Sequence, residues 1–373
     1  MNVPILDRLD ALIADVVAPA ASEVDRTGAF PTAAMDALRD AGFYGLLSST
    51  AVGGLGLGPR EAVAVVERLA RACASTAMVT CMHYAGAAVI ERFGAESARR
   101  AVARGEHLST LAFSEVGSRS HFWAPLGVAR AEGDHVRLTG AKSWITSARH
   151  ATAYVWSSQP VAAEGASTLW LVARDRDGLR VGAGFDGLGL RGNDSSPVTA
   201  EGVRVTDAER LGADGGGLAT MLEVVLPLFA AMNAGCSVGI MERAVGGTLA
   251  HASATRHQHL GSSLADLPTI RAYIARMKIA LDQARLLLDD TVSAMETGRA
   301  DTMLRVLQSK AAAGESATVV TDLAMRVCGG AAFRKELGIE RAFRDARAAT
   351  VMAPTTDQLY DFLGKALCGL PVF

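Results

Sequence analysis

The chain has 373 residues, half of them hydrophobic, and a formal net charge of −2. This length exceeds what a single core usually needs, so two or three packed units are expected. A net charge near zero provides no basic surface for nucleic acid or for a membrane, and we expect neither as a partner.

The cysteines and the first residues of the chain predict a cytoplasmic protein. The five cysteines are scattered without metal-binding spacing, so we expect no metal site and small buried thiols in a reducing compartment. The opening residues lack the basic and apolar regions of a secretory signal.

Residues 1–107 are predicted to form an N-terminal helical domain. Apolar residues recur at helical spacing in 60–71 and 74–93, and Gly42 ends a shorter helix that begins at Thr32. His83 lies within the helix predicted over 74–93, where we expect a hydrogen-bonded core histidine rather than a substrate-facing one.

Residues 108–212 are predicted to form a middle β-domain. All four tryptophans lie in this part of the chain. Alternating apolar and polar residues predict strands in 127–139, 153–157, 168–173 and 198–205, the first interrupted by a Gly-Asp turn.

Residues 213–373 are predicted to form a C-terminal four-helix bundle. Long helical segments run over about 217–256, 264–297, 301–328 and 355–369. The most apolar stretch, 224–240, contains Pro227 and is short for a membrane span, so we expect a buried helix there.

Four segments resemble the acyl-CoA dehydrogenase family, in the right order. Residues 109–120 are similar to its Thr-Glu-Pro-x-x-Gly-Ser-Asp segment, and 138–147 to its Gly-x-Lys-x-Trp-Ile-Thr-Asn segment. Residues 327–333 resemble Ile-Leu-Gly-Gly-x-Gly-Phe, and 340–347 resemble Glu-Arg-x-x-Arg-Asp-Ala. The resemblance implies the α+β fold of that family, with a helical domain, a β-domain and a four-helix bundle covering essentially the whole chain.

The resemblance also implies FAD as the cofactor. In the family the first two segments hold the flavin, with the tryptophan beside its ring system and the Ile-Thr backbone and hydroxyl on its polar edge. The matching residues here are Ser114, Glu115, Ser120, Trp144, Ile145 and Thr146. Ser120 also matches a family serine near the phosphopantetheine region of acyl carriers.

Other family contacts to FAD cross a subunit boundary, so the resemblance implies a homodimer or homotetramer. The degraded arginine segment places Arg256 or His257 near the pyrophosphate. Arg326, Gly329, Gly330 and Thr355 are the remaining implied cofactor contacts. We expect Arg344 and Asp345 to form a structural ion pair.

The base departs from the family pattern. Oxidation of an acyl thioester at Cα–Cβ needs a group that removes the α-proton while the flavin accepts the β-hydride. Ala353 stands where the usual glutamate belongs, and Phe229 stands at a second family position. Asp357, one helical turn beyond Ala353, and Glu223 on the long helix are the candidate displaced bases.

Three functions remain open at this point. The first is FAD-dependent oxidation of an acyl thioester, carried by CoA or a carrier protein, with electrons passing to an electron-transfer flavoprotein or oxygen. The second is a flavin monooxygenase or oxidase on the same fold, with His121 and Asn233 as candidate polar groups. The third is a catalytically silent partner subunit. Small residues on the long helix, Ala230, Ala231, Ala234 and Gly235, are expected to line a substrate cavity.

Overall fold

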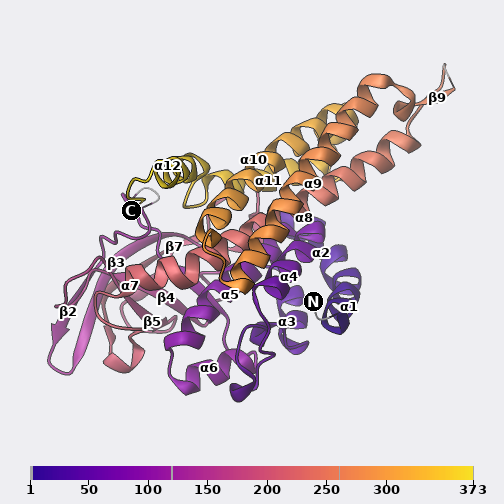
Figure 1. Cartoon of the computed structure of the whole chain (residues 1–373). Helices are drawn as coiled ribbons and strands as arrows, with labels where there is room; N and C mark the ends of the chain where they lie inside the picture. Colours follow the sequence, from indigo (N-terminus) through magenta and orange to yellow (C-terminus); the bar gives the residue numbers. More distant parts are fainter. Residues whose placement is uncertain (1–2, 119–120, 260, 373) are drawn as a thin grey trace.

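The computed structural model describes residues 3–118, 121–259 and 261–372. Helices come first, then two sheets, then helices again (Figure 1). The N-terminal helices are α1 (Val3–Leu12), α2 (Ala18–Thr27), α3 (Thr32–Asp40), α4 (Pro59–Ala72), α5 (Ala74–Phe93) and α6 (Glu96–Ala103).

The middle strands are β1 (Ser109–Ala112), β2 (Val128–Glu132), β3 (His135–Ile145), β4 (Ala153–Ser158), β5 (Thr168–Ala173), β6 (Leu179–Val181) and β7 (Ser196–Val205). The C-terminal elements are α7 (Gly217–Thr220), α8 (Leu226–Ala254), β8 (Arg256–His257), β9 (Ser262–Ser263), α9 (Pro268–Thr297), α10 (Thr302–Cys328), α11 (Ile339–Val351) and α12 (Thr356–Leu367).

The middle domain consists of two sheets around a core of its own. One sheet has the order β1-β4-β5, with β1 parallel to β4, and the other is antiparallel with the order β2-β3-β7-β6. Trp156 and Trp170 are fully buried in the core of this domain. The alternation in the sequence predicts these strands because one face of each strand packs inward.

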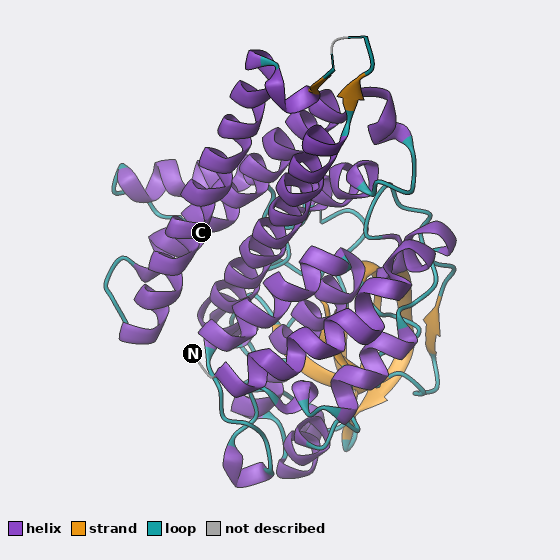
Figure 2. Cartoon of the chain, turned by 90° about the vertical axis from the view of Figure 1, so that its right-hand side faces the viewer, coloured by secondary structure: helices purple, strands orange, loops and turns teal. Residues whose placement is uncertain are grey.

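The C-terminal helices confirm most of the predicted segments and add one. Helices α8, α9, α10 and α12 occupy the predicted stretches, but α11 was not predicted as a helix. The helical run Gly217–Ala254 is long and apolar enough to cross a membrane, and 89% of its most apolar window is buried inside the protein. Figure 2 shows the strands of the middle domain at one end of the long helices, with the β8–β9 hairpin at the other end.

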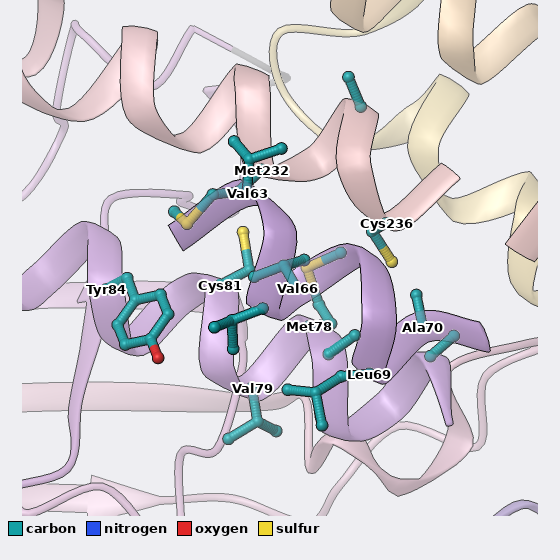
Figure 3. Packing of buried hydrophobic residues seen from close by; sticks show 14 of the residues in the cluster. Val63, Val66, Leu69, Ala70, Met78, Val79, Cys81, Tyr84, Met232 and Cys236 are labelled. Atoms are coloured by element: carbon teal, nitrogen blue, oxygen red, sulfur yellow. The ribbon is translucent and has the colours of Figure 1, made fainter. Parts of the chain in front are cut away.

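The main core joins the N-terminal helices to the bundle. Figure 3 shows Val63 and Leu69 of α4, Met78 of α5 and Met232 of α8 packed together. Ala230, Ala231, Ala234 and Gly235 are buried, and a Cβ added at Gly235 would meet the Val63 side chain at 3.1 Å. None of these four residues lines the cavity described below, so the expectation that they do is wrong. At Gly235 the missing side chain instead lets α8 approach α4 closely.

His83 is a core histidine with both ring nitrogens engaged. Its Nε2 lies 3.0 Å from the Tyr44 carbonyl oxygen, and its Nδ1 accepts a hydrogen bond of 3.0 Å from the Ser109 amide. The Ser109 amide can only donate, so Nε2 carries the proton and the ring is neutral. Burial lowers the pKa of His83 to about 4. It ties α5 to β1 and to the turn after α3.

Candidate functional site

A cavity of about 630 Å³ lies where the three domains meet. Its walls come from the loop after β1, the end of β3, the loop 185–195, the start of α8 and the segment 348–354. Most lining side chains are apolar, which is the usual character of a site for a flat organic cofactor and its substrate.

Five of the six predicted flavin contacts line this cavity. They are Ser114, Glu115, Trp144, Ile145 and Thr146, although Ser114 and Trp144 are 30 residues apart along the chain. The Ser143 amide donates to the Ser114 carbonyl oxygen at 2.9 Å, which fixes the two segments side by side. Ser120, the sixth predicted flavin contact, lies outside the described residues.

Trp144 is held in an unusual conformation at the rim. Its φ is +57°, in the left-handed region that a tryptophan rarely adopts, and 59% of the residue is exposed. The indole stacks on Phe185 with ring centroids 4.1 Å apart. A strained backbone that presents a large exposed aromatic to a cavity is a feature of binding sites rather than of cores.

Glu115 lines the cavity, but its carboxylate is engaged in a buried ion pair. Lys142 Nζ lies 2.6 Å from Glu115 Oε1, and both side chains are almost completely buried. The same carboxylate accepts the backbone amides of Leu126 and Gly127. Lys142 also donates to the Ser157 carbonyl oxygen at 2.7 Å. Burial lowers the pKa of Lys142 to about 8, although the neighbouring Glu115 carboxylate opposes this shift by favouring the charged form of Lys142. Glu115 therefore fixes the loop and does not offer a free carboxylate to a ligand.

Both family base positions face the cavity as apolar side chains. Ala353 and Phe229 line it, on the segment after α11 and on α8. The structure does not bring either candidate displaced base to this wall. Asp357 is exposed on the first turn of α12, and Glu223 is exposed and lies 3.6 Å from Arg92. Neither lines the cavity. Ala353 lies in the loop after α11, which ends at Val351, and α12 begins only at Thr356, so the two residues do not share a helix face as the sequence had suggested.

Glu115 and Arg191 are the charged residues among the described side chains that line the cavity. Arg191 donates to Asp186 at 2.6 Å and to the Asp25 carbonyl oxygen at 2.8 Å. Since both charged groups are already paired, the described part of the wall presents no free carboxylate and no imidazole to a bound ligand.

The remaining predicted cofactor contacts lie elsewhere in this chain. Arg256 and His257 form β8 in the hairpin at the far tip of the bundle (Figure 1). Arg326 pairs with Asp322 near the end of α10, where Gly329 and Gly330 follow. None of them lines the cavity, and neither does Thr355, whose hydroxyl accepts from the Gln358 amide as the N-cap of α12.

The polar groups considered for oxygen chemistry also lie off the cavity lining. His121 is exposed, with Nδ1 2.9 Å from the Ser118 carbonyl oxygen. Asn233 is buried one turn beyond Phe229, with its Nδ2 3.7 Å from the sulfur of Met352. The expected Arg344–Asp345 ion pair is wrong: Arg344 pairs with Asp25 at 2.6 Å and with Glu340 at 2.6 Å.

Two features of the site were missed from the sequence. Phe185, in a loop far from either motif, had no local signal that would place it against Trp144. Lys310 did carry a signal, because it interrupts an apolar stretch of the helix 302–328. It is buried and donates to the segment that contains Ala353, as described below.

The residues present fit the flavin end of FAD. Trp144 and Phe185 provide an aromatic surface, and backbone groups of the Ser114 and Thr146 segments lie at the same wall. Phe229 and Met352 add apolar side chains to the lining. A flat ring system with one polar edge matches a lining that combines apolar side chains with a few polar groups.

Comparison with known proteins agrees with this assignment. The family models "Acyl-CoA dehydrogenase, N-terminal domain", "middle domain" and "C-terminal domain" match residues 4–105, 110–203 and 215–368. The chain is 27% identical over 366 residues to a probable acyl-CoA dehydrogenase, FadE25, of Mycobacterium tuberculosis, covering 96% of this chain and 92% of that protein.

A human relative and a solved structure are also similar. The chain is 29% identical over 348 residues to the human mitochondrial short-chain specific acyl-CoA dehydrogenase, covering 91% of this chain and 83% of the relative. The structure of butyryl-CoA dehydrogenase from Megasphaera elsdenii superposes with a TM-score of 0.91 at 21% identity, covering 98% and 97% of the two chains.

Proposed function

Since the chain belongs to the acyl-CoA dehydrogenase family and is an FAD-dependent oxidoreductase, we propose that it oxidises an acyl thioester without a side-chain base of its own. The observation that carries the proposal is the apolar wall at Ala353 and Phe229, the two positions where relatives place the base. A methyl group and a phenyl ring cannot accept a proton.

The proposed reaction removes the α-hydrogen of the acyl group as a proton and the β-hydrogen as a hydride. Bound FAD supplies the hydride acceptor. The residues of this chain bind and orient the cofactor and the substrate: Trp144, Phe185, Phe229 and Met352 all line the cavity. The α-proton leaves to water or to a basic group of the substrate itself. Substrates whose α-proton is already acidic are therefore favoured over simple saturated acyl groups.

Oxygen chemistry at the same FAD is the second candidate function. It is favoured by the same wall, because reaction of reduced flavin with oxygen needs a shielded pocket and no α-proton base. A silent partner subunit would likewise need no base. The two alternatives differ from thioester oxidation in one observable: neither predicts that an acyl thioester reduces the bound FAD in the absence of oxygen.

The deciding experiment places a carboxylate back at the wall. The purified protein and its Ala353→Glu variant are mixed with saturated acyl-CoA thioesters without oxygen, and loss of the flavin absorbance is followed. We expect slow bleaching in the native protein and a rise of about 10²-fold in Ala353→Glu, the lower range of general-base contributions.

Ala353→Gln is the matched control, since it has the same size and no base, and it should bleach no faster than the native protein. Asp357→Asn and Glu223→Gln should leave the rate unchanged. Fast bleaching by the native protein that Asp357→Asn abolishes would contradict the proposal and establish a displaced base. If neither the native protein nor Ala353→Glu bleaches, but native FAD that has been reduced chemically is rapidly reoxidised by oxygen, the oxygen-using function replaces the thioester oxidation proposed here.

We also propose that the protein works as a homodimer or homotetramer and passes electrons to an electron-transfer flavoprotein or oxygen. The distance of the β8–β9 hairpin from the cavity supports the first part, because in a single chain Arg256 and His257 are at the opposite end of the bundle (Figure 2). Loss of FAD from Arg256→Ala, with an unchanged monomer fold by circular dichroism, would be the expected result of a contact across subunits.

A further inference from the structure

A buried lysine stands directly behind the wall that lacks the base. Lys310, in the middle of α10, is 1% exposed. Its Nζ donates to the carbonyl oxygens of Ala349 at 3.2 Å, Met352 at 3.0 Å and Pro354 at 2.8 Å. The three acceptors belong to the last turn of α11 and to the loop that follows it, and Met352 and Pro354 line the cavity on either side of Ala353.

The hydrogen-bond geometry matches the charged form of the lysine. An ammonium group has three N–H donors and a neutral amine has two, so three carbonyl acceptors are all satisfied only when Lys310 is protonated. The first acceptor is a carbonyl in the last turn of a helix, where a cation is favoured by the helix dipole. No carboxylate is recorded within ion-pair distance of Lys310 among the described residues, so its charge is balanced by backbone dipoles alone.

We propose that Lys310 is a positioning residue, which anchors the segment 349–354 to α10 and places a positive charge behind the cavity wall. The anchor fixes where the side chain at position 353 meets the cavity. The charge lies behind Met352 and Pro354, which line the cavity, and favours the negative charge that a bound flavin gains on reduction. The inference requires the FAD site but not the base-free reaction proposed above.

The charge of Lys310 should be sensitive to pH near neutrality. Burial lowers its pKa to about 7, and the titratable group that faces it is the Cys81 thiol on α5. Burial raises the pKa of Cys81 well above its ordinary value, so this thiol stays neutral over the same range. Above pH 7 the neutral amine would leave one of the three carbonyls without a donor.

The first measurement is hydrogen exchange of the holoenzyme, comparing the native protein with Lys310→Met. Methionine keeps an unbranched apolar stem and removes the donors and the charge. Amides between 350 and 359 should exchange at least ~10-fold faster in Lys310→Met, as expected when about 1.4 kcal/mol of local stability is lost. Lys278→Met is the matched control, because Lys278 is an exposed lysine on α9 paired with Asp282, and it should change nothing in this segment.

The second measurement separates the charge from packing. The midpoint potential of bound FAD is measured at pH 6 and pH 8 in the same proteins. Lys310→Met should have a more negative potential than the native protein at pH 6, and the difference should shrink at pH 8, where native Lys310 is mostly neutral. A merely structural lysine would give a difference that does not depend on pH.

The proposal is overturned if exchange in the segment is unchanged in Lys310→Met, or if the potential difference is absent at pH 6. If Lys310→Met does not fold, the native protein provides the test by hydrogen exchange at pH 6 and pH 8. After correction for the intrinsic pH dependence of exchange, the amides between 350 and 359 should lose protection relative to those of α9 as the pH rises from 6 to 8. A ratio of the two protection factors that does not change with pH would overturn the proposal. Anaerobic bleaching by thioesters, which tests the reaction, plays no part in either measurement.

Discussion

Single residues at the cavity rim decide how the cofactor is held. Trp144 combines a left-handed backbone, an exposed indole and a stacked partner in Phe185. The left-handed conformation costs a tryptophan of the order of 1 kcal/mol or more in the absence of a ligand. A protein retains a strained conformation of this kind when the side chain that it presents, here the indole of Trp144, is used to bind a ligand.

Trp144→Ala should weaken retention of FAD while leaving the fold intact. Removing the indole takes away most of one aromatic wall, and the exposed position makes little contribution to the core. The flavin-to-protein ratio after gel filtration is the measurement, and we expect it to fall at least severalfold. Leu286→Ala is the control, since Leu286 is a similarly exposed apolar residue on α9, and it should keep its full flavin content. Unchanged flavin content in Trp144→Ala would remove Trp144 from the site.

At the scale of elements, the ion pair between Glu115 and Lys142 joins the loop after β1 to β3. The two residues also form an isolated antiparallel bridge through their backbones. The two cofactor segments, far apart in sequence, are thereby held at one wall of the cavity. The buried ion pair fixes the positions of the two segments relative to each other. It adds little to the net stability of the fold, because the cost of removing both charges from water offsets much of their attraction.

Glu115→Gln should destabilise the protein more than the double variant Glu115→Gln with Lys142→Met. The single change leaves Lys142 buried without its counter-charge, which costs about 3–5 kcal/mol in unfolding free energy. The double change removes both charges and should recover part of that loss. Urea unfolding measures both effects. Equal stability of Glu115→Gln and the native protein would show that the pair is not buried in solution.

At the scale of the whole molecule, buried histidines make stability depend on pH. His83 and His107 are both buried, and burial lowers the pKa of each to about 4. The folded state therefore binds fewer protons than the unfolded state between pH 4 and the ordinary histidine value near 6.5. Their neutral form stabilises the fold above pH 6.5, and this contribution is lost as the pH falls toward 4.

His83→Gln should reduce the loss of stability between pH 6.5 and pH 4 by up to about 3 kcal/mol, since glutamine has no proton to gain. The glutamine amide can still donate to the Tyr44 carbonyl and accept from the Ser109 amide, so the variant differs from the native protein mainly in the loss of the titratable group. The slope of the unfolding free energy against pH is the measurement. His259→Gln, at an exposed position in the hairpin, should keep the native slope. An identical slope in His83→Gln would mean that His83 titrates normally in the fold.

The sequence by itself determined the family, the order of helical and β-domains, and FAD as the cofactor, and five of its predicted cofactor contacts between Ser114 and Thr146 line the cavity. It could do so because these features depend on local patterns: the spacing of apolar residues and short motifs at strand ends. Ala353 and Phe229, which the sequence predicts at the two family base positions, both line the cavity. Only the tertiary structure decided which charges are free, since pairing depends on side chains distant in the chain. Glu115 is paired with Lys142, Arg344 takes Asp25, and Lys310 reaches a segment about forty residues away. Asp357 and Glu223 failed to reach the wall for the same reason: the direction of a side chain is set by where its helix begins and what packs beside it.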